Sequence, residues 1–216
     1  MKEKYFTIKN IKHVSKKMLE RVSSRKILEL RKDINLLDSA LLVIDMQRYF
    51  TSSCSHAFVQ SSQAIIGNIK KLVGFFLSQK KPVIFTRHID KKNKNNMLLK
   101  WWHDRIRKND PLSEIDERVY DPLGLVVVKS QYDAFYKTEL ENILTRHKIK
   151  KLFITGVVAN LCCETTARTA FVRGYEVYFG LDTTAAYCFE HHIASVINIS
   201  YGFGVPFFLS DLVDED

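Results

Sequence analysis

Three side chains that could together perform thiol chemistry follow apolar stretches of the chain. Asp45 and Lys129 each end such a stretch, and Cys162 follows another one at the start of a predicted helix. A carboxylate can take the proton of a thiol, while an ammonium and a helix N-terminus both favour the thiolate. Each residue also has an ordinary explanation: a helix cap, a surface lysine and a small buried side chain. Taken jointly, they form a candidate nucleophilic site.

The elements that must position these residues are predicted strands separated by helical patterns. The apolar runs lie at 40–45, 82–86, 124–129, 151–157, 176–180 and 205–209. They lack polar alternation, which is typical of parallel strands buried on both faces. Amphipathic patterns between them predict a three-layer α/β/α domain, and Pro206 predicts an edge position for the last strand. Ligands of such sheets bind beyond the carboxyl ends of the strands, where the three candidates lie.

Composition excludes several classes of protein. The 216 residues are 46% hydrophobic and contain only 8 Gly and 4 Pro, so neither a collagen-like nor a disordered chain is expected. No apolar run reaches the roughly 18 residues of a membrane span, and the first residues lack a signal-peptide core. The four cysteines form no CxxC pair and are expected to be reduced. A cytoplasmic protein is therefore expected.

The net charge of +9 is unevenly distributed along the chain. Residues 1–38 hold 11 Lys and Arg against 5 Asp and Glu, and residues 87–108 hold 8 against 2, so each segment contributes +6 and the remainder carries 9 − 12 = −3. We expect a basic extension over 1–38, helical over 12–32 and packed on a domain over 39–216, with a lid-like insertion at about 90–122. Aromatic residues do not alternate with the basic ones, so nucleic-acid or membrane binding is a remote alternative.

Three segments resemble a known family. ALLVIDMQRYF (40–50), VVVKSQYDAFYKTEL (126–140) and ITGVVANLCCETTARTAFVRGYEV (154–177) are similar to the signature segments of the isochorismatase-like cysteine hydrolases, from about residue 38 onward. That superfamily includes nicotinamidases, N-carbamoylsarcosine amidases and isochorismatases. The resemblance implies a six-stranded parallel sheet of order 3-2-1-4-5-6 and association into homo-oligomers. It also implies Cys162 as nucleophile, Asp45 as proton acceptor and donor, and Lys129 as the cation that orients both.

The resemblance further implies how the nucleophile's turn is built. Family members commonly carry a non-proline cis peptide just before this turn, which here would join Val158 and Ala159. Such a bond would aim the Ala159 N–H into an oxyanion site beside the N–H of Cys162. Cys163 would point elsewhere on the helix and pack, and Cys54 and Cys188 fit no pattern and are expected to be structural.

A metal is not expected. Nicotinamidases bind a divalent ion through an Asp-x-His and a later His after the second strand, whereas the corresponding segment here reads T-R-H-I-D (86–90). His88, Asp90 and His103 could converge, but isolated histidines are more often capping or solvated groups. We therefore expect neither a metal nor another cofactor, and the missing motif points away from a nicotinamidase.

The substrate pocket is expected to have an aromatic wall. The candidates are Phe50, Trp101, Trp102, Tyr132 and Phe135, of which Phe50 and Phe135 could equally belong to the core. Arg87, at a strand end, could bind a substrate carboxylate through two hydrogen bonds. The basic insertion could attract an anionic small molecule.

These residues predict a metal-free, cysteine-dependent hydrolase that cleaves a C–N bond of a small amide or carbamoyl compound through a thioester. The alternative is an isochorismatase-type vinyl-ether hydrolase, in which Asp45 protonates substrate carbon and Cys162 takes no part. The family's true isochorismatases often replace the cysteine, so the thiol here favours C–N hydrolysis.

Overall fold

The computed structural model describes residues 2–91 and 96–213 and contains one six-stranded sheet in the order β3-β2-β1-β4-β5-β6. Every neighbouring pair is parallel. The strands are β1 (Ser39–Ile44), β2 (Val83–His88), β3 (Leu125–Lys129), β4 (Lys151–Val157), β5 (Glu176–Ala185) and β6 (Val205–Phe207). The predicted fold and strand order are confirmed, and Pro206 lies in the edge strand β6.

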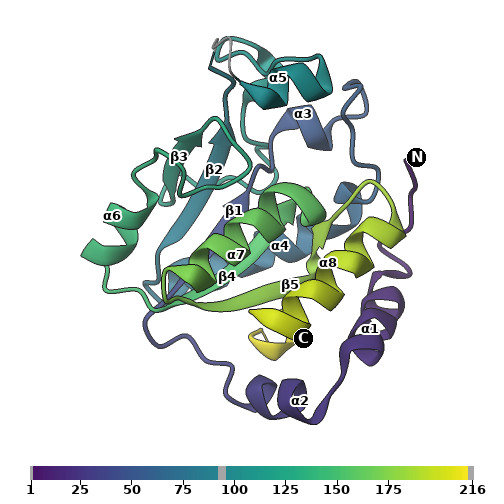
Figure 1. Cartoon of the computed structure of the whole chain (residues 1–216), viewed down its shortest axis with the longest axis vertical. Helices are drawn as coiled ribbons and strands as arrows, with labels where there is room; N and C mark the ends of the chain where they lie inside the picture. Colours follow the sequence, from purple (N-terminus) through teal and green to yellow (C-terminus); the bar gives the residue numbers. More distant parts are fainter. Residues whose placement is uncertain (1, 92–95, 214–216) are drawn as a thin grey trace.

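Eight α-helices accompany the sheet in the described residues. They are α1 (Ile11–Val22), α2 (Arg25–Lys32), α3 (Arg48–Thr51), α4 (Ser62–Ser78), α5 (Met97–Trp102), α6 (Leu140–Arg146), α7 (Glu164–Val172) and α8 (Phe189–Gly202). α7 and α8 cover one face of the sheet and α4 covers the other (Figure 1). None of the helices within 2–91 and 96–213 combines the length and the apolar character needed to cross a membrane.

The central position of strand β1 explains why its sequence is an uninterrupted apolar run. It lies between β2 and β4 and beneath helices on both faces, and all six of its residues are buried. Edge strand β3 differs, because Leu125 and Val126 are 39% and 42% exposed. The site residues that follow β1 therefore continue from a strand that is buried along its whole length.

The N-terminal extension forms two helices, whereas one helix over 12–32 was predicted. The helix stops after Val22 because Ser24 adopts an extended conformation and caps α2, its side chain accepting a hydrogen bond from the Ile27 N–H at 3.2 Å. Met18 of α1 and Ile27 of α2 are buried. α1 packs against α8 and β5, and α2 packs against β6.

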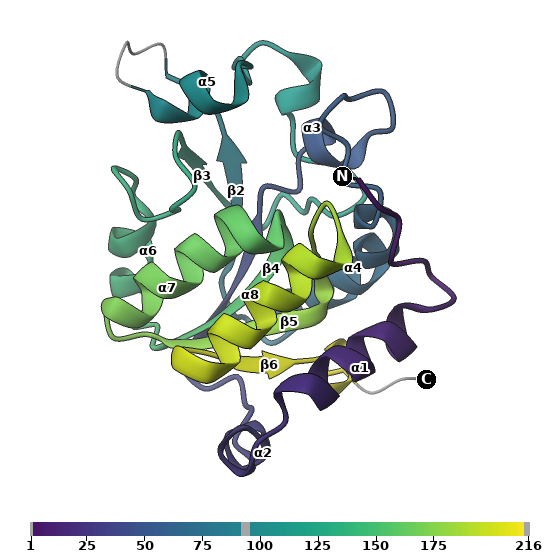
Figure 2. The ribbon, with the colours of Figure 1, turned by 45° about the vertical axis from the view of Figure 1, so that its right-hand side comes forward.

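The predicted insertion at 90–122 lies over the carboxyl ends of β2 and β3 (Figure 2). It contains α5, a 3-10 helix over Pro111–Ser113, and an isolated bridge between Gln47 and Ile115. Its residues 92–95 are outside the described part of the chain. The insertion thus stands at the edge of the sheet where ligands of this fold bind.

Candidate active site

The site forms where the strand order reverses, between β1 and β4. Asp45 follows β1, Lys129 ends β3, and Cys162 follows β4 by one turn. Gly156 in β4 has φ +106°, and a Cβ there would lie 2.1 Å from the backbone oxygen of Ile44. Only glycine lets the two strands approach this closely. The close approach brings the residues after each strand to one point.

Cys162 lies in a π-helical turn, Ala159–Cys163, that leads directly into α7. Such turns are frequent at functional sites. The N–H groups of Leu161 and Cys163 donate to the Val158 carbonyl at 3.0 and 3.3 Å. The cis peptide joins Val157 and Val158, so its predicted position at Val158–Ala159 was wrong by one residue. β4 ends at Val157, as the apolar run 151–157 predicted, and the cis bond directly follows the last residue of the strand.

Lys129 connects the acid and the thiol. Its Nζ lies 2.6 Å from Asp45 Oδ2 and 3.4 Å from Cys162 Sγ, and it donates to the Gln131 carbonyl at 2.9 Å. Neither the lysine nor the aspartate side chain is exposed. Burial lowers the pKa of Lys129, but the Asp45 carboxylate and the contact with Cys162 together outweigh it and hold that pKa above its ordinary value. The lysine is therefore an ammonium at neutral pH.

Asp45 is held by Thr86 of β2, a residue that the sequence analysis missed. Thr86 Oγ1 donates to Asp45 Oδ1 at 2.6 Å and accepts from the Asp45 N–H at 2.9 Å. Asp45 itself has a left-handed backbone conformation, with φ 47°. One carboxylate oxygen thus takes the threonine hydroxyl and the other takes the ammonium. The sequence feature that could have identified Thr86 is its polar side chain at the end of the apolar run 82–86.

The Cys162 thiol is protonated at rest. Burial raises its pKa most strongly; Lys129 opposes this, and Asp45 raises the pKa further. Lys129 lowers the thiol pKa, as the sequence predicted, but burial outweighs this effect because Cys162 is only 5% exposed. A base must remove the proton, and the Asp45 carboxylate faces the thiol.

The other cysteines lie outside this cluster. Cys163 is buried, with Sγ 4.0 Å from the Thr155 carbonyl oxygen. Burial also raises the pKa of this thiol. Cys188 is buried and Cys54 is exposed. Cys162 is thus the cysteine that pairs with the ammonium.

A cavity of about 390 Å³ opens beside Cys162. Of the predicted aromatic wall, Phe50, Trp102 and Tyr132 line it. The cavity is also lined by Tyr49, Tyr187 and Lys2, which were not predicted from the sequence. No sequence signal could have found Tyr187 or Lys2, because they come from the end of β5 and from the N-terminal extension, far apart in the chain. The lining is mainly apolar and aromatic.

Three predicted pocket residues do not line the cavity. Arg87 points to the other face of β2 from His88, as successive strand residues do, and donates to Glu114 Oε1 and Ser113 Oγ, both at 2.7 Å. Phe135 is core, 5% exposed and stacked on Tyr175. Trp101 is 73% exposed. The predicted role of Arg87 in binding a carboxylate is corrected: its guanidinium holds the 108–114 segment in place.

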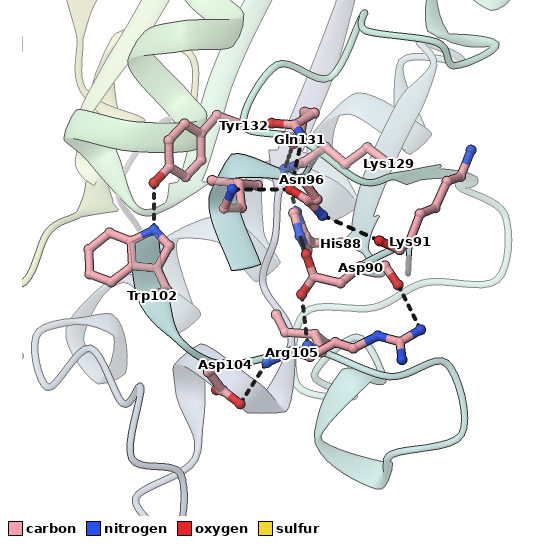
Figure 3. A network of polar contacts seen from close by, with 12 residues as sticks. His88, Asp90, Lys91, Asn96, Trp102, Asp104, Arg105, Lys129, Gln131 and Tyr132 are labelled. Atoms are coloured by element: carbon pink, nitrogen blue, oxygen red, sulfur yellow. Dashed lines mark hydrogen bonds and ion pairs between the residues drawn. The ribbon is translucent and has the colours of Figure 1, made fainter. Parts of the chain in front are cut away.

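His88 and Asp90 meet at the cavity (Figure 3). His88 Nε2 lies 3.1 Å from Asp90 Oδ1, and Asp90 Oδ2 accepts from the Ile106 N–H at 2.8 Å. His103 is exposed at the end of α5. Across residues 2–91 and 96–213, no three His, Cys, Asp or Glu side chains gather as metal ligands. Within the described ranges, His88 and Asp90 therefore pair with each other without a third side chain of metal-ligating type.

Polar contacts tie the insertion to the end of β3 (Figure 3). Trp102 Nε1 donates to the Tyr132 hydroxyl at 2.6 Å. Gln131 Nε2 donates to Asn96 Oδ1 at 3.3 Å, and this same oxygen caps α5 by accepting from the Leu98 N–H at 3.1 Å. α5 is thus held over the cavity by the residues that follow Lys129.

Fold and site together define an α/β protein with an acid, a cation and a thiol at the switch point of a parallel sheet. The chain belongs to the isochorismatase family, since the model of the isochorismatase domain matches residues 39–207. It is similar to "Nicotinamidase 3" of Arabidopsis thaliana, with 36% identity over 187 residues that cover 84% of this chain and 90% of that protein. It is also 30% identical to enterobactin synthase component B of Escherichia coli, over 73% of this chain and 56% of that protein.

Solved structures share the fold. A cysteine hydrolase from Pseudomonas syringae pv. phaseolicola superimposes with a TM-score of 0.78 at 26% identity, covering 82% of this chain and 92% of that one. N-carbamoylsarcosine amidase from Thermoplasma acidophilum superimposes with a TM-score of 0.71 at 22% identity, covering 82% and 98%. The family resemblance of the sequence is thereby confirmed.

Proposed function

We propose that the protein is a cysteine-dependent hydrolase that cleaves the C–N bond of a small amide. The observation that carries the proposal is the buried cluster in which Lys129 Nζ contacts both Asp45 Oδ2 and Cys162 Sγ at the wall of an aromatic cavity. A protonated nucleophile, a base and a fixed cation are what covalent amide hydrolysis requires.

In the acylation step, Asp45 accepts the proton of Cys162 as the sulfur attacks the amide carbon. A C–S bond forms, and the carbonyl electron pair moves to oxygen. The N–H groups of Ala159 and Cys162 are our candidates for binding that oxyanion, because those of Leu161 and Cys163 already donate to Val158. When the tetrahedral intermediate collapses, the C–N bond breaks and Asp45 protonates the departing ammonia or amine.

In the deacylation step, a water molecule attacks the thioester while Asp45 accepts its proton. The C–S bond breaks, and the sulfur recovers the proton from Asp45. One water is consumed, and a carboxylic acid and ammonia or an amine are released. Throughout, the Lys129 ammonium offsets the negative charge that moves between the carboxylate and the sulfur.

The substrate proposed first is a flat aromatic amide. The aromatic lining of the cavity supports this, and so does the similarity to a protein named nicotinamidase. The missing Asp-x-His motif points away from a nicotinamidase, whereas this similarity points toward one. Nicotinamide is therefore the amide to assay first. Arg87 was predicted to bind a substrate carboxylate, but its guanidinium donates to the 108–114 segment. The proposed substrate is therefore not required to carry a carboxylate.

The test is amide turnover by the wild type and by Cys162→Ala and Cys162→Ser, followed as ammonia release. Cys54→Ser is the matched control, because Cys54 is exposed and outside the cluster. We expect both Cys162 variants to lose at least about 10³-fold in kcat, the scale seen when a catalytic nucleophile is removed, and the control to keep its rate. Amide turnover that persists in Cys162→Ala would remove the nucleophile assignment.

Vinyl-ether hydrolysis remains the second candidate, because a relative named isochorismatase, from Bacillus subtilis, matches this chain at 28% identity. Here Asp45 would protonate a substrate carbon and the thiol would take no part. Isochorismate turnover that survives Cys162→Ala and disappears in Asp45→Ala would support this chemistry over amide hydrolysis.

A further inference from the structure

Three tyrosines line the cavity, and the hydroxyls of two of them donate hydrogen bonds to acceptor atoms of the protein itself. Tyr49 donates to Asp104 Oδ2, and Tyr187 donates to the Ala57 carbonyl at 2.9 Å. Each of these O–H groups therefore has an acceptor before any substrate arrives, and neither is left to recognise one.

The third hydroxyl, that of Tyr132, accepts a hydrogen bond from the protein and, within the described residues, does not donate one. It accepts the indole N–H of Trp102 at 2.6 Å (Figure 3). An indole nitrogen can only donate, so the tyrosine oxygen must be the acceptor and its own proton stays available. Within residues 2–91 and 96–213, Trp102 is the hydrogen-bond partner found for this hydroxyl.

Tyr132 also keeps that proton at neutral pH. Burial raises its pKa above the ordinary value, and the Trp102 hydrogen bond only partly opposes the effect. The side chain follows Lys129 by three residues and lines the same cavity as Cys162. A neutral O–H donor, held in place by the Trp102 indole N–H, therefore lines the cavity that Cys162 also lines.

We propose that Tyr132 is a specificity-determining residue that donates a hydrogen bond to an acceptor atom in the group attached to the substrate amide. This inference rests on the proposed amide hydrolysis and narrows its substrate class. The preferred amides carry a hydrogen-bond acceptor, such as a pyridine-type ring nitrogen. An analogue with C–H at that position leaves the hydroxyl without an acceptor, which is the kind of mismatch that hydrogen-bonding sites reject.

The experiment compares nicotinamide with benzamide, which have the same shape and differ by one ring nitrogen. Binding is measured by calorimetry on Cys162→Ala, so that no turnover occurs. We expect nicotinamide to bind about tenfold more tightly than benzamide, the scale of one hydrogen bond. Adding Tyr132→Phe should reduce the preference to about twofold or less by weakening nicotinamide binding, while benzamide affinity is kept.

Two further variants separate this role from packing. Tyr136→Phe removes a hydroxyl from an exposed tyrosine in the same loop and should keep the preference. Trp102→Phe leaves the Tyr132 hydroxyl free to rotate and should give an intermediate preference. Equal affinities for the two amides in Cys162→Ala would overturn the inference, as would absence of nicotinamide binding or an equal loss of both affinities in Tyr132→Phe. Selective binding by Cys162→Ala, combined with a wild type that hydrolyses neither amide, would instead reject the proposed function alone.

Discussion

Replacing Lys129 by methionine should destabilise the fold strongly, because it leaves a charge buried without a partner. The Asp45 and Lys129 side chains are both 0% exposed, and Nζ lies 2.6 Å from Oδ2. Removing one member of such a pair costs about 3–5 kcal/mol, whereas losing an exposed pair costs at most about 1 kcal/mol. We therefore expect Lys129→Met to lower the free energy of unfolding by about 3–5 kcal/mol in chemical denaturation at pH 7.

A double-mutant cycle tests the cause of that loss. Asp45→Asn combined with Lys129→Met removes both charges, and the asparagine can still accept from Thr86, so the double variant should cost less than the sum of the two single ones. The matched control is Lys150→Met, which breaks an ion pair with Asp38 whose side chains are 74% and 40% exposed. Additive losses in the cycle, or equal losses for Lys129→Met and Lys150→Met, would refute the reasoning.

Three other perturbations have outcomes set by the structure. Gly156→Ala places a Cβ 2.1 Å from the Ile44 oxygen, so it should cost more than about 3 kcal/mol in thermal unfolding and abolish turnover; a variant of normal stability would show that the strands can separate. Thr86→Val removes both hydrogen bonds to Asp45, and a loss of about 1–3 kcal/mol is expected, with kcat falling more than KM changes. Burial lowers the pKa of His192 to about 3 from 6.5, so the unfolded chain binds its proton first, and stability should fall by about 1.4 kcal/mol per pH unit below pH 6.5. His192→Asn should lack this slope in urea titrations between pH 4 and 7, and an unchanged slope would contradict the assignment.

The sequence by itself determined the frame and the chemical identity of the cluster. Short continuous apolar runs separated by helical patterns are typical of parallel strands covered on both faces, so the runs ending at Asp45 and Lys129 predicted strands whose ends meet. The signature segments resembled those of one family, and the chain belongs to it. In this structure, Lys129 contacts both Asp45 and Cys162, and the catalytic roles that the resemblance implies for the three residues are a proposal.

Other features depended on tertiary neighbours that no local pattern records. Arg87 and His88 are adjacent in the chain, yet alternation along β2 turns one toward the 108–114 segment and the other toward the cavity. Burial raises the pKa of Cys162 by more than Lys129 lowers it, and burial depends on how the whole domain packs. Likewise, Tyr132 acquires its free proton only because folding places Trp102 against its hydroxyl. The kinds of reactive group are thus encoded locally, whereas their direction, ionisation and hydrogen-bond partners are decided by what packs against them.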